Sequence, residues 1–422
     1  MAVVLFNPAI SQDAASGSKQ RKFVQISSQE SSPSVSAIAP IDDKNVFFLN
    51  KEGQIGVAKF SPGLSQIGWE LYSDVKWSGL SELTIGPNYS LVFAAPGEIT
   101  QAFDTDQNME LDFFQALVRT WPGKDQGSSI TAGPIADAYG RILFAISPYI
   151  EEEGETPRAR IVAWHPSSKE LIPVTNSQLP VSSFALSSDG LLAARLDMPD
   201  YKDGYYLSLT EIPSFNPQAP VPESVPYTRP SLLIPAELTK GAEPTKFAFY
   251  HDGGQEKLLA TCPDSRRLIE IIPEERGGIW QGSFLVHSET KENLVTLVEM
   301  KEGSVLGGGE SGFIPVELAP DDFRISKIEL RQNLIVLDFT QPVDRTEAVK
   351  PESYSVTAIS LSSSGDRKLA AEPIIESDGE TVILKVEEIP TETVLRIVCQ
   401  NVPSDSGESL LSPMVFSTIH KK

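Results

Sequence analysis

The stretch SVSAIAPIDDKNVFFLNKEGQIGVAKF, residues 34–60, contains three short apolar segments separated by turns rich in Asp, Asn and Gly. Similar stretches begin at residues 80, 128, 181 and 245, each with an apolar segment, a polar turn and a second apolar segment. Short apolar runs bounded by turn formers are typical of β-strands. No amphipathic helical pattern lies between them, which argues against a parallel α/β sheet. The sequence therefore predicts an all-β protein built from a repeated unit.

The spacing of the units favours a β-propeller. They begin roughly 45–65 residues apart, close to the ~40–50 residues of one propeller blade. A weaker sixth unit combines residues 282–286 with 294–298, so six blades are preferred and seven are the alternative. Residues 22–26 would close the ring by pairing with the last blade and covering its edge. Equivalent core positions are expected at Phe48, Phe93, Phe144 and Leu259.

A second domain is predicted where the pattern changes, near residue 321. Alternating strands at 325–330 and 334–339, and two more later in about a hundred residues, are typical of an Ig-like β-sandwich. We expect a flexible N-terminus at 1–20, a propeller at 21–318 and an Ig-like sandwich at 319–422. The linker should lie at about 310–322, so that limited proteolysis there releases a C-terminal fragment that folds alone.

Two motifs of this second domain resemble a known family. ELRQNLIVLDFTQPVDRTEAVKPESYSV (329–356) and VPSDSGESLL (402–411) resemble bacterial Ig-like modules. Together with WQGSFLVHSE (280–289), the arrangement is similar to secreted proteins of planctomycetes and verrucomicrobia. In those proteins a propeller related to glucose/sorbosone dehydrogenases precedes an Ig-like module. The resemblance implies an extracytoplasmic location. The family's histidine- and glycine-rich base segment and a C-x-x-C-H haem site are not recognisable here.

Composition excludes several classes of partner. The 422 residues carry 35 Lys plus Arg against 57 Asp plus Glu, a formal charge of −22. A field of this sign repels nucleic acid and anionic lipid. No apolar run approaches the ~20 residues that span a bilayer. The two cysteines, Cys262 and Cys399, are expected to be buried thiols, and four scattered histidines form no transition-metal motif.

The stretch VLGGGESGFIP, residues 305–315, spells G-x-G-x-x-G with Gly307, Gly309 and Gly312. A dinucleotide site needs a helix after this motif, whereas Pro315 follows within an extended sequence. The nucleotide interpretation is therefore rejected. The glycines are expected to provide unusual φ angles where the chain leaves the last blade.

The candidate catalytic residues are His251 and Asp252, which follow a predicted inner strand. A carboxylate beside an imidazole can orient it as a general base. Neighbours on a strand point to opposite faces, however, so the two side chains need not meet. Turn formation explains Asp252 equally well.

The candidate metal ligands are Asp104, Asp106 and Asn108, at positions 1, 3 and 5 of an EF-hand pattern. Position 6 is Met109 where the loop needs Gly, and position 12 is Gln115 where a bidentate Glu belongs. A full EF-hand is rejected, which leaves a loose calcium site on the rim as the prediction.

We expect a non-catalytic binding or scaffold propeller, with a protein or glycan ligand at its central funnel and no cofactor. The alternative, which the family resemblance allows, is a sugar dehydrogenase that uses pyrroloquinoline quinone, with His251 as its base. A lactonase-like hydrolase is a third hypothesis and would need a carboxylate-bound divalent metal.

Overall fold

A computed structural model of the chain confirms the all-β class. It describes residues 24–25 and, from 33 to 420, all residues except 62, 74, 78, 81, 107–110, 150–157, 198–203, 213–229, 253–254, 301–302, 319–321 and 362–364. Within these residues the only α-helix is α1 (Arg345–Ala348). No helix of the described residues is long and apolar enough to cross a membrane.

Six antiparallel sheets follow one another along residues 37–316, and we number them blade 1 to blade 6. Within each blade, consecutive strands pair with each other. Blade 1 contains β2 (Ala37–Pro40), β3 (Asn45–Leu49), β4 (Ile55–Phe60) and β5 (Gln66–Leu71). Blade 2 contains β6 (Leu83–Ile85), β7 (Leu91–Ala95), β8 (Glu98–Phe103) and β9 (Phe113–Val118). Blade 3 contains β10 (Ser129–Ala136), β11 (Ile142–Tyr149), β12 (Arg158–Trp164) and β13 (Leu171–Ser177). Blade 4 contains β14 (Val181–Leu186), β15 (Leu191–Leu196), β16 (Gly204–Glu211) and β17 (Leu232–Pro235). Blade 5 contains β18 (Lys246–Asp252), β19 (Gln255–Cys262), β20 (Arg267–Arg276) and β21 (Ile279–Glu289). Blade 6 contains β22 (Leu294–Glu299), β23 (Val305–Gly309) and β24 (Gly312–Val316).

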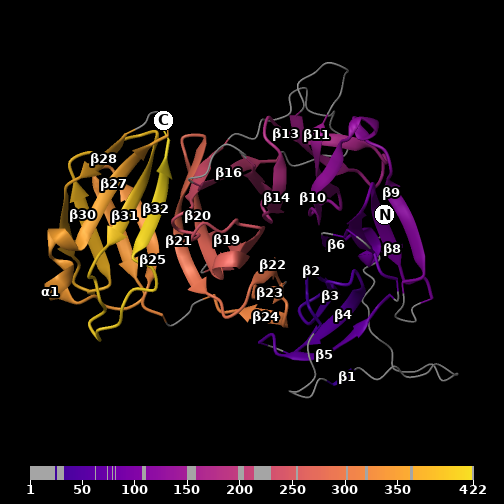
Figure 1. The fold of residues 1–422 in the computed structure, drawn as a ribbon, viewed down its shortest axis with the longest axis horizontal. Coiled ribbons are helices and arrows are strands. Elements are labelled where there is room, and N and C mark those ends of the chain that lie inside the picture. Colours follow the sequence, from indigo (N-terminus) through magenta and orange to yellow (C-terminus); the bar gives the residue numbers. More distant parts are fainter. Residues whose placement is uncertain are drawn as a thin grey trace, which may run out of the picture.

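The first strands of the blades form a closed ring. Each of β2, β6, β10, β14, β18 and β22 contacts the next, and β22 contacts β2. The blades therefore surround a common centre, from indigo in blade 1 to orange in blade 6 (Figure 1). This is a propeller-like arrangement, and the five repeats of the sequence each contain the first strand of one blade.

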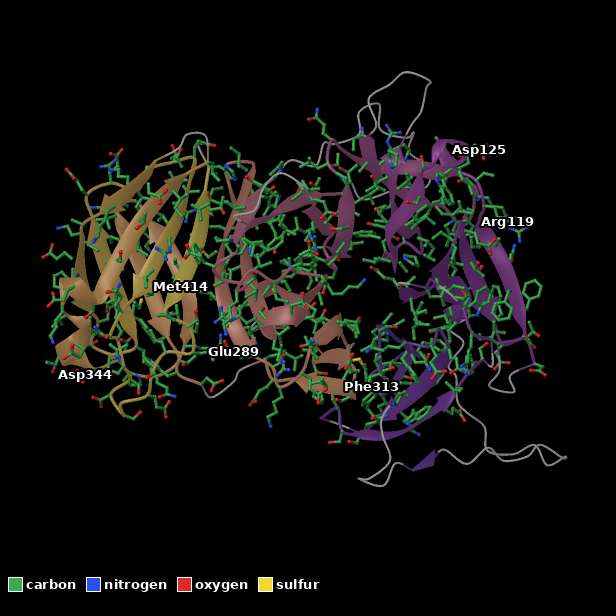
Figure 2. The ribbon with its side chains drawn as sticks, viewed as in Figure 1. Arg119, Asp125, Glu289, Phe313, Asp344 and Met414 are labelled. Carbon is green, nitrogen blue, oxygen red and sulfur yellow. The ribbon has the colours of Figure 1, made fainter. Side chains whose placement is uncertain are left out.

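The ring closes between blades 6 and 1. The Val35 N–H donates to the Gly309 carbonyl at 2.8 Å. Phe313, labelled at this seam in Figure 2, packs edge-on against Phe48 and Phe60 with ring centroids 5.4 and 5.2 Å away. The expected closure by residues 22–26 is wrong, because β1 (Val24–Gln25) pairs with β5 and so covers the outer edge of blade 1.

The four expected core positions are all fully buried, but they do not all face the same way. Phe48, Phe93 and Phe144 each pack against the preceding blade. Leu259 instead packs against Leu297 of blade 6, the blade that follows. A shift of one residue along a strand turns a side chain to the opposite face, which explains the difference.

The sixth unit predicted from the sequence is placed wrongly. Residues 282–286 belong to β21, the last strand of blade 5, and blade 6 begins only at β22. The glycine stretch forms the hairpin β23–β24 of this blade. A Cβ on Gly308 would lie 2.5 Å from Val35 Cγ1, and one on Gly309 would lie 2.4 Å from the Asn293 carbonyl oxygen. Gly308 and Gly309 are therefore required because neighbouring segments approach them closely, not because of an unusual φ. Of the glycines in this stretch, only Gly312 has a positive φ, 110°.

The C-terminal part consists of two four-stranded sheets stacked on one core. One sheet has the order β25-β26-β30-β29 and the other β32-β31-β27-β28. Their buried apolar side chains form a single cluster that includes Leu337, Leu384, Val356 and Ile397. The strands are β25 (Ile325–Arg331), β26 (Leu334–Phe339), β27 (Tyr354–Ser360), β28 (Asp366–Leu369), β29 (Ala371–Ile375), β30 (Thr381–Val386), β31 (Thr393–Cys399) and β32 (Met414–Ile419). We call this part the sandwich.

The sandwich and blade 5 share one sheet. β21 pairs with β32, which joins the two into an eight-stranded sheet (Figure 1). Phe416 of β32 lies in the same buried cluster as Phe284 of blade 5 and Leu233 of blade 4. Of the expected linker, residues 319–321 lie outside the described part of the chain. The two parts are therefore connected by backbone pairing and a common core as well as by the covalent chain.

Candidate functional site

A cavity of about 320 Å³ lies where the six first strands converge. All six of these strands contribute to its wall, so it is the central channel of the ring. Most of the lining residues are apolar in type, with Phe184, Phe247 and Phe249 among the largest side chains, but polar and apolar atoms contribute about equally to the exposed wall. A concave space that combines apolar side chains with polar groups is a common form of ligand site. Arg119 and Asp125, in contrast, lie on the outer edge of the ring (Figure 2).

One end of the channel contains an ion pair between opposite blades. Lys246, at the start of β18 in blade 5, pairs with Glu82, which precedes β6 in blade 2. Both side chains line the cavity and are largely buried, 21% and 14% exposed. Each charge therefore has its partner inside the wall, and the pair ties two blades together across the channel.

The other end of the channel is where the first strands lead into their turns, and we call it the turn side. Here His251, at the end of β18, meets Glu299, at the end of β22. Its Nδ1 and its backbone N–H both lie 3.2 Å from Glu299 Oε1. The expected partner Asp252 points elsewhere and pairs with Lys257 at 2.9 Å. The carboxylate beside His251 thus comes from the neighbouring blade.

Electrostatics on the turn side favour a protonated histidine. The hydrogen bond with Glu299 raises the pKa of His251, and Glu256 and Asp189 add to the effect. Burial raises the pKa of Glu256 itself, with a further contribution from Asp189. His251 is therefore surrounded by carboxylates from blades 4, 5 and 6. The raised pKa increases the protonated fraction of His251 near neutral pH, and only the unprotonated fraction can accept a proton from a substrate.

The Glu299→Gln variant should lower the pKa of His251 toward its ordinary value of 6.5, measured by NMR titration of the imidazole. The raised pKa means that the pair contributes to stability below pH 6.5 and that this contribution is lost as the pH rises through the raised value. Buried His287 is the internal control, because burial lowers its pKa and it lies away from Glu299. An unchanged His251 titration in the variant would contradict the pairing.

A buried charge cluster in blade 5 was missed from the sequence. Glu270, 1% exposed, lies 2.9 Å from Lys257 Nζ and 3.9 Å from Arg324 Nη1. Tyr250 is fully buried beside it, and burial and the Glu270 charge raise its pKa. The signal was a single glutamate inside the apolar strand Leu268–Ile272 in β20, a position where an unpaired charge would be expensive.

The predicted metal ligands are brought together only in part. Carboxylate oxygens of Asp104, Asp106 and Asp112 lie within 4.8 Å of one another in the β8–β9 connection. Asn108 lies outside the described residues. Asp112, which the EF-hand pattern missed, accepts hydrogen bonds from the backbone N–H and the hydroxyl of Thr105, and these bonds lower its pKa. Asp104 accepts from the Tyr72 hydroxyl at 2.9 Å. Calcium binding there stays a prediction.

Both cysteines are buried free thiols, and burial raises the pKa of each to about 12. A thiol with such a pKa is not a nucleophile near neutral pH. His165, 7% exposed, accepts a hydrogen bond from the Ser168 backbone N–H at 3.3 Å. These residues pack in the core and contribute nothing to the channel wall as described.

Comparison with known proteins gives a likeness of architecture only. No family model matches the sequence, and no curated protein matches it. A putative glucose dehydrogenase of Thermus thermophilus is similar at 13% identity, covering 65% of this chain and 90% of its own, with a TM-score of 0.46. The soluble aldose sugar dehydrogenase of Escherichia coli is similar at 11% identity, covering 67% of this chain and 95% of its own, with a TM-score of 0.43. A gluconolactonase of Xanthomonas campestris is similar at 12% identity, covering 67% of this chain and 85% of its own, with a TM-score of 0.46. Identities and scores this low establish no activity for this chain.

Proposed function

We propose that the chain is a non-catalytic binding protein that recognises a protein or glycan at the turn side of its channel. The observation that carries this is the pairing of the charges in the channel. Among the described lining residues, Lys246 pairs with Glu82 and Glu299 pairs with His251. A catalytic centre needs a nucleophile, base or cofactor ligand directed at the substrate. His251, the candidate base, lies at the turn side but does not line the cavity. A wall whose charged side chains are paired offers shape and contact area instead.

The architecture proposed with this function is a six-bladed propeller at 21–318 and an Ig-like sandwich at 319–422. The strand order supports the second part. Eight strands in sequence divide into β25-β26-β30-β29 and β32-β31-β27-β28. Taken as strands A to G with an added C′, their orders are A-B-E-D and G-F-C-C′, the orders expected of an Ig-like sandwich. The family resemblance supports an extracytoplasmic location.

The quinone-dependent dehydrogenase is the alternative, and the channel does not fit its cofactor. The carboxylates of pyrroloquinoline quinone call for several available cations. Lys246 is the single Lys or Arg among the described lining residues, and it is paired with Glu82. A lactonase-like site would need a carboxylate cluster in the channel. The three-carboxylate group of the described residues lies instead at Asp104, Asp106 and Asp112, none of which lines the cavity.

The Ser188→Trp variant should weaken ligand binding at least tenfold. Ser188 lines the cavity and is exposed on the turn side, so an indole there blocks the mouth without entering the core. Ligands would first be selected on the wild-type chain from a glycan microarray and a displayed peptide library. The matched control is Ser377→Trp in an exposed turn of the sandwich, which should bind as the wild type does. Ligands that bind all three proteins equally would place recognition elsewhere and contradict the proposal.

A further inference from the structure

Two exposed tyrosines stand on adjacent blades at the turn side. Tyr89 follows β6 and is 65% exposed, and Tyr139 follows β10 and is 54% exposed. Their turns touch each other, because a Cβ on Gly140 would lie 3.8 Å from Pro87 Cγ. Large aromatic side chains are normally covered in a folded protein, and exposed ones are typical of recognition surfaces. Two exposed rings therefore stand on touching turns at the turn side.

Both rings are held on constrained backbone. The Asp137 carboxylate accepts from the backbone N–H groups of Tyr139 and Arg141, each at 2.9 Å, and from Arg141 Nε at 2.5 Å. Asp137 and Arg141 are 4% and 5% exposed, so this turn is fixed by a buried ion pair. The Arg141 guanidinium also lies 5.7 Å from the centre of the Tyr139 ring. An aromatic group fixed in this way loses little entropy when it binds a partner.

Tyr89 adopts a left-handed backbone conformation with φ of 58°. Bulky residues rarely adopt it, and such strain persists mainly where the surroundings or a function require it. The turn is stabilised locally by the Ser90 hydroxyl, which donates to the Pro87 carbonyl at 2.7 Å. The strained residue is thus also the most exposed of the large hydrophobic side chains described.

The rest of the turn side is rich in carboxylates. Asp43 of blade 1 and Asp189 of blade 4 are exposed in the turns that follow their first strands. Asp252 and Glu299 add two carboxylates at the ends of β18 and β22, where they pair with Lys257 and His251. The cations on the same side are exposed Lys44 and the paired Lys257 and His251. With a formal charge of −22 on the whole chain, this surface complements a cationic ligand.

We propose that the turn side binds an extended basic protein segment, with Arg or Lys side chains over Tyr89 and Tyr139 and further cations at Asp43 and Asp189. Cations bind well over tyrosine faces, and Arg also stacks on them. A neutral glycan could stack on the rings and donate hydroxyl hydrogen bonds to the carboxylates, but it would gain no charge attraction from them. The inference rests on the proposed function and names the class of ligand.

The test uses fluorescein-labelled peptides of twelve residues, alternating Arg with Ser, and a neutral control in which Gln replaces Arg. Fluorescence anisotropy with the full chain should show binding of the Arg peptide and none of the Gln peptide. Tyr89→Ala and Tyr139→Ala should each weaken binding about tenfold, as truncation of an aromatic anchor does. Neither variant changes the net charge. Tyr139→Phe keeps the ring and should retain binding, which separates recognition from damage to the turn.

The matched control is Phe113→Ala, because Phe113 is 49% exposed on β9 and should not affect the affinity. Equal affinity of the tyrosine variants and the wild type would mean general charge attraction and would overturn the proposal. Tyrosine-dependent binding to neutral oligosaccharides without binding to the Arg peptide would overturn it in favour of a glycan. That result would contradict the basic ligand but agree with the proposed binding function. Catalytic turnover of a sugar would contradict the proposed function itself.

Discussion

Replacement of Phe416 with alanine should lower the free energy of unfolding by about 3–5 kcal/mol, the range for deleting a buried aromatic side chain. Phe416 is fully buried on β32 and faces Phe284 directly across the pairing of β32 with β21. Its cluster combines apolar side chains of blades 4 and 5 with those of the sandwich. The cavity left by the ring would therefore weaken both parts of the molecule.

The transition should remain single, because the shared sheet and core couple the sandwich to the propeller-like ring. Denaturant unfolding followed by tryptophan fluorescence is informative here, because all five tryptophans lie in residues 69–280, in the ring. Far-ultraviolet circular dichroism reports both parts. The control is Val349→Ala, 51% exposed in the sandwich, which should change stability by less than about 0.5 kcal/mol. Two separate transitions, with unchanged tryptophan fluorescence in the first, would contradict the coupling.

The Glu270→Gln variant should also cost about 3–5 kcal/mol, because it removes the anion from a buried charge cluster. Lys257 and Arg324 would keep their charges with side chains only 12% and 8% exposed. Lys257 would retain Asp252, but Arg324 would lose the carboxylate it faces. Glutamine is nearly the same size as glutamate, so the effect reports charge rather than volume.

The matched control for this variant is Glu274→Gln on the same strand. Glu274 pairs with Arg276 at 2.6 Å, but its side chain is 47% exposed. Exposed pairs contribute about 0–1 kcal/mol, so the control should remain close to wild type in urea denaturation. A loss below about 1 kcal/mol in Glu270→Gln would show that the buried cations are stabilised without this carboxylate.

The repeated blades were predictable from the sequence because each blade is specified by short patterns of neighbouring residues. Short apolar strands and Asp-, Asn- or Gly-containing turns recur, and the five repeats locate the first strands of blades 1 to 5. Blade 6 was misplaced because Gly307, Gly308 and Gly309 were expected at the exit from the last blade and not in one of its strands. They form a strand whose missing side chains allow neighbouring segments to approach.

Long-range pairing was not predictable in the same way. Phe284 and Phe416 pair across more than a hundred residues, and no local pattern specifies that a sandwich strand continues a blade. The expectation that a C-terminal fragment folds alone remains a prediction. In such a fragment Val394 and Phe416, both buried now, would lose the blade residues that cover them.

The candidate site shows the same limit. The sequence located His251 at the end of a first strand, but its partner Glu299 comes from the next blade and 48 residues further along. Asp252, the neighbour in sequence, points away because side chains alternate along a strand. Likewise, Asp112 joins Asp104 and Asp106 through the fold of a hairpin, and the EF-hand spacing did not include it.

Turnover of a sugar is the measurement that tests the binding assignment most directly. The purified chain would be supplied with calcium and pyrroloquinoline quinone, offered a panel of aldoses, and followed by reduction of an artificial electron acceptor. Paired channel charges predict no reduction above the control without protein. Turnover that disappears in His251→Ala at unchanged thermal stability would contradict the account and identify a dehydrogenase.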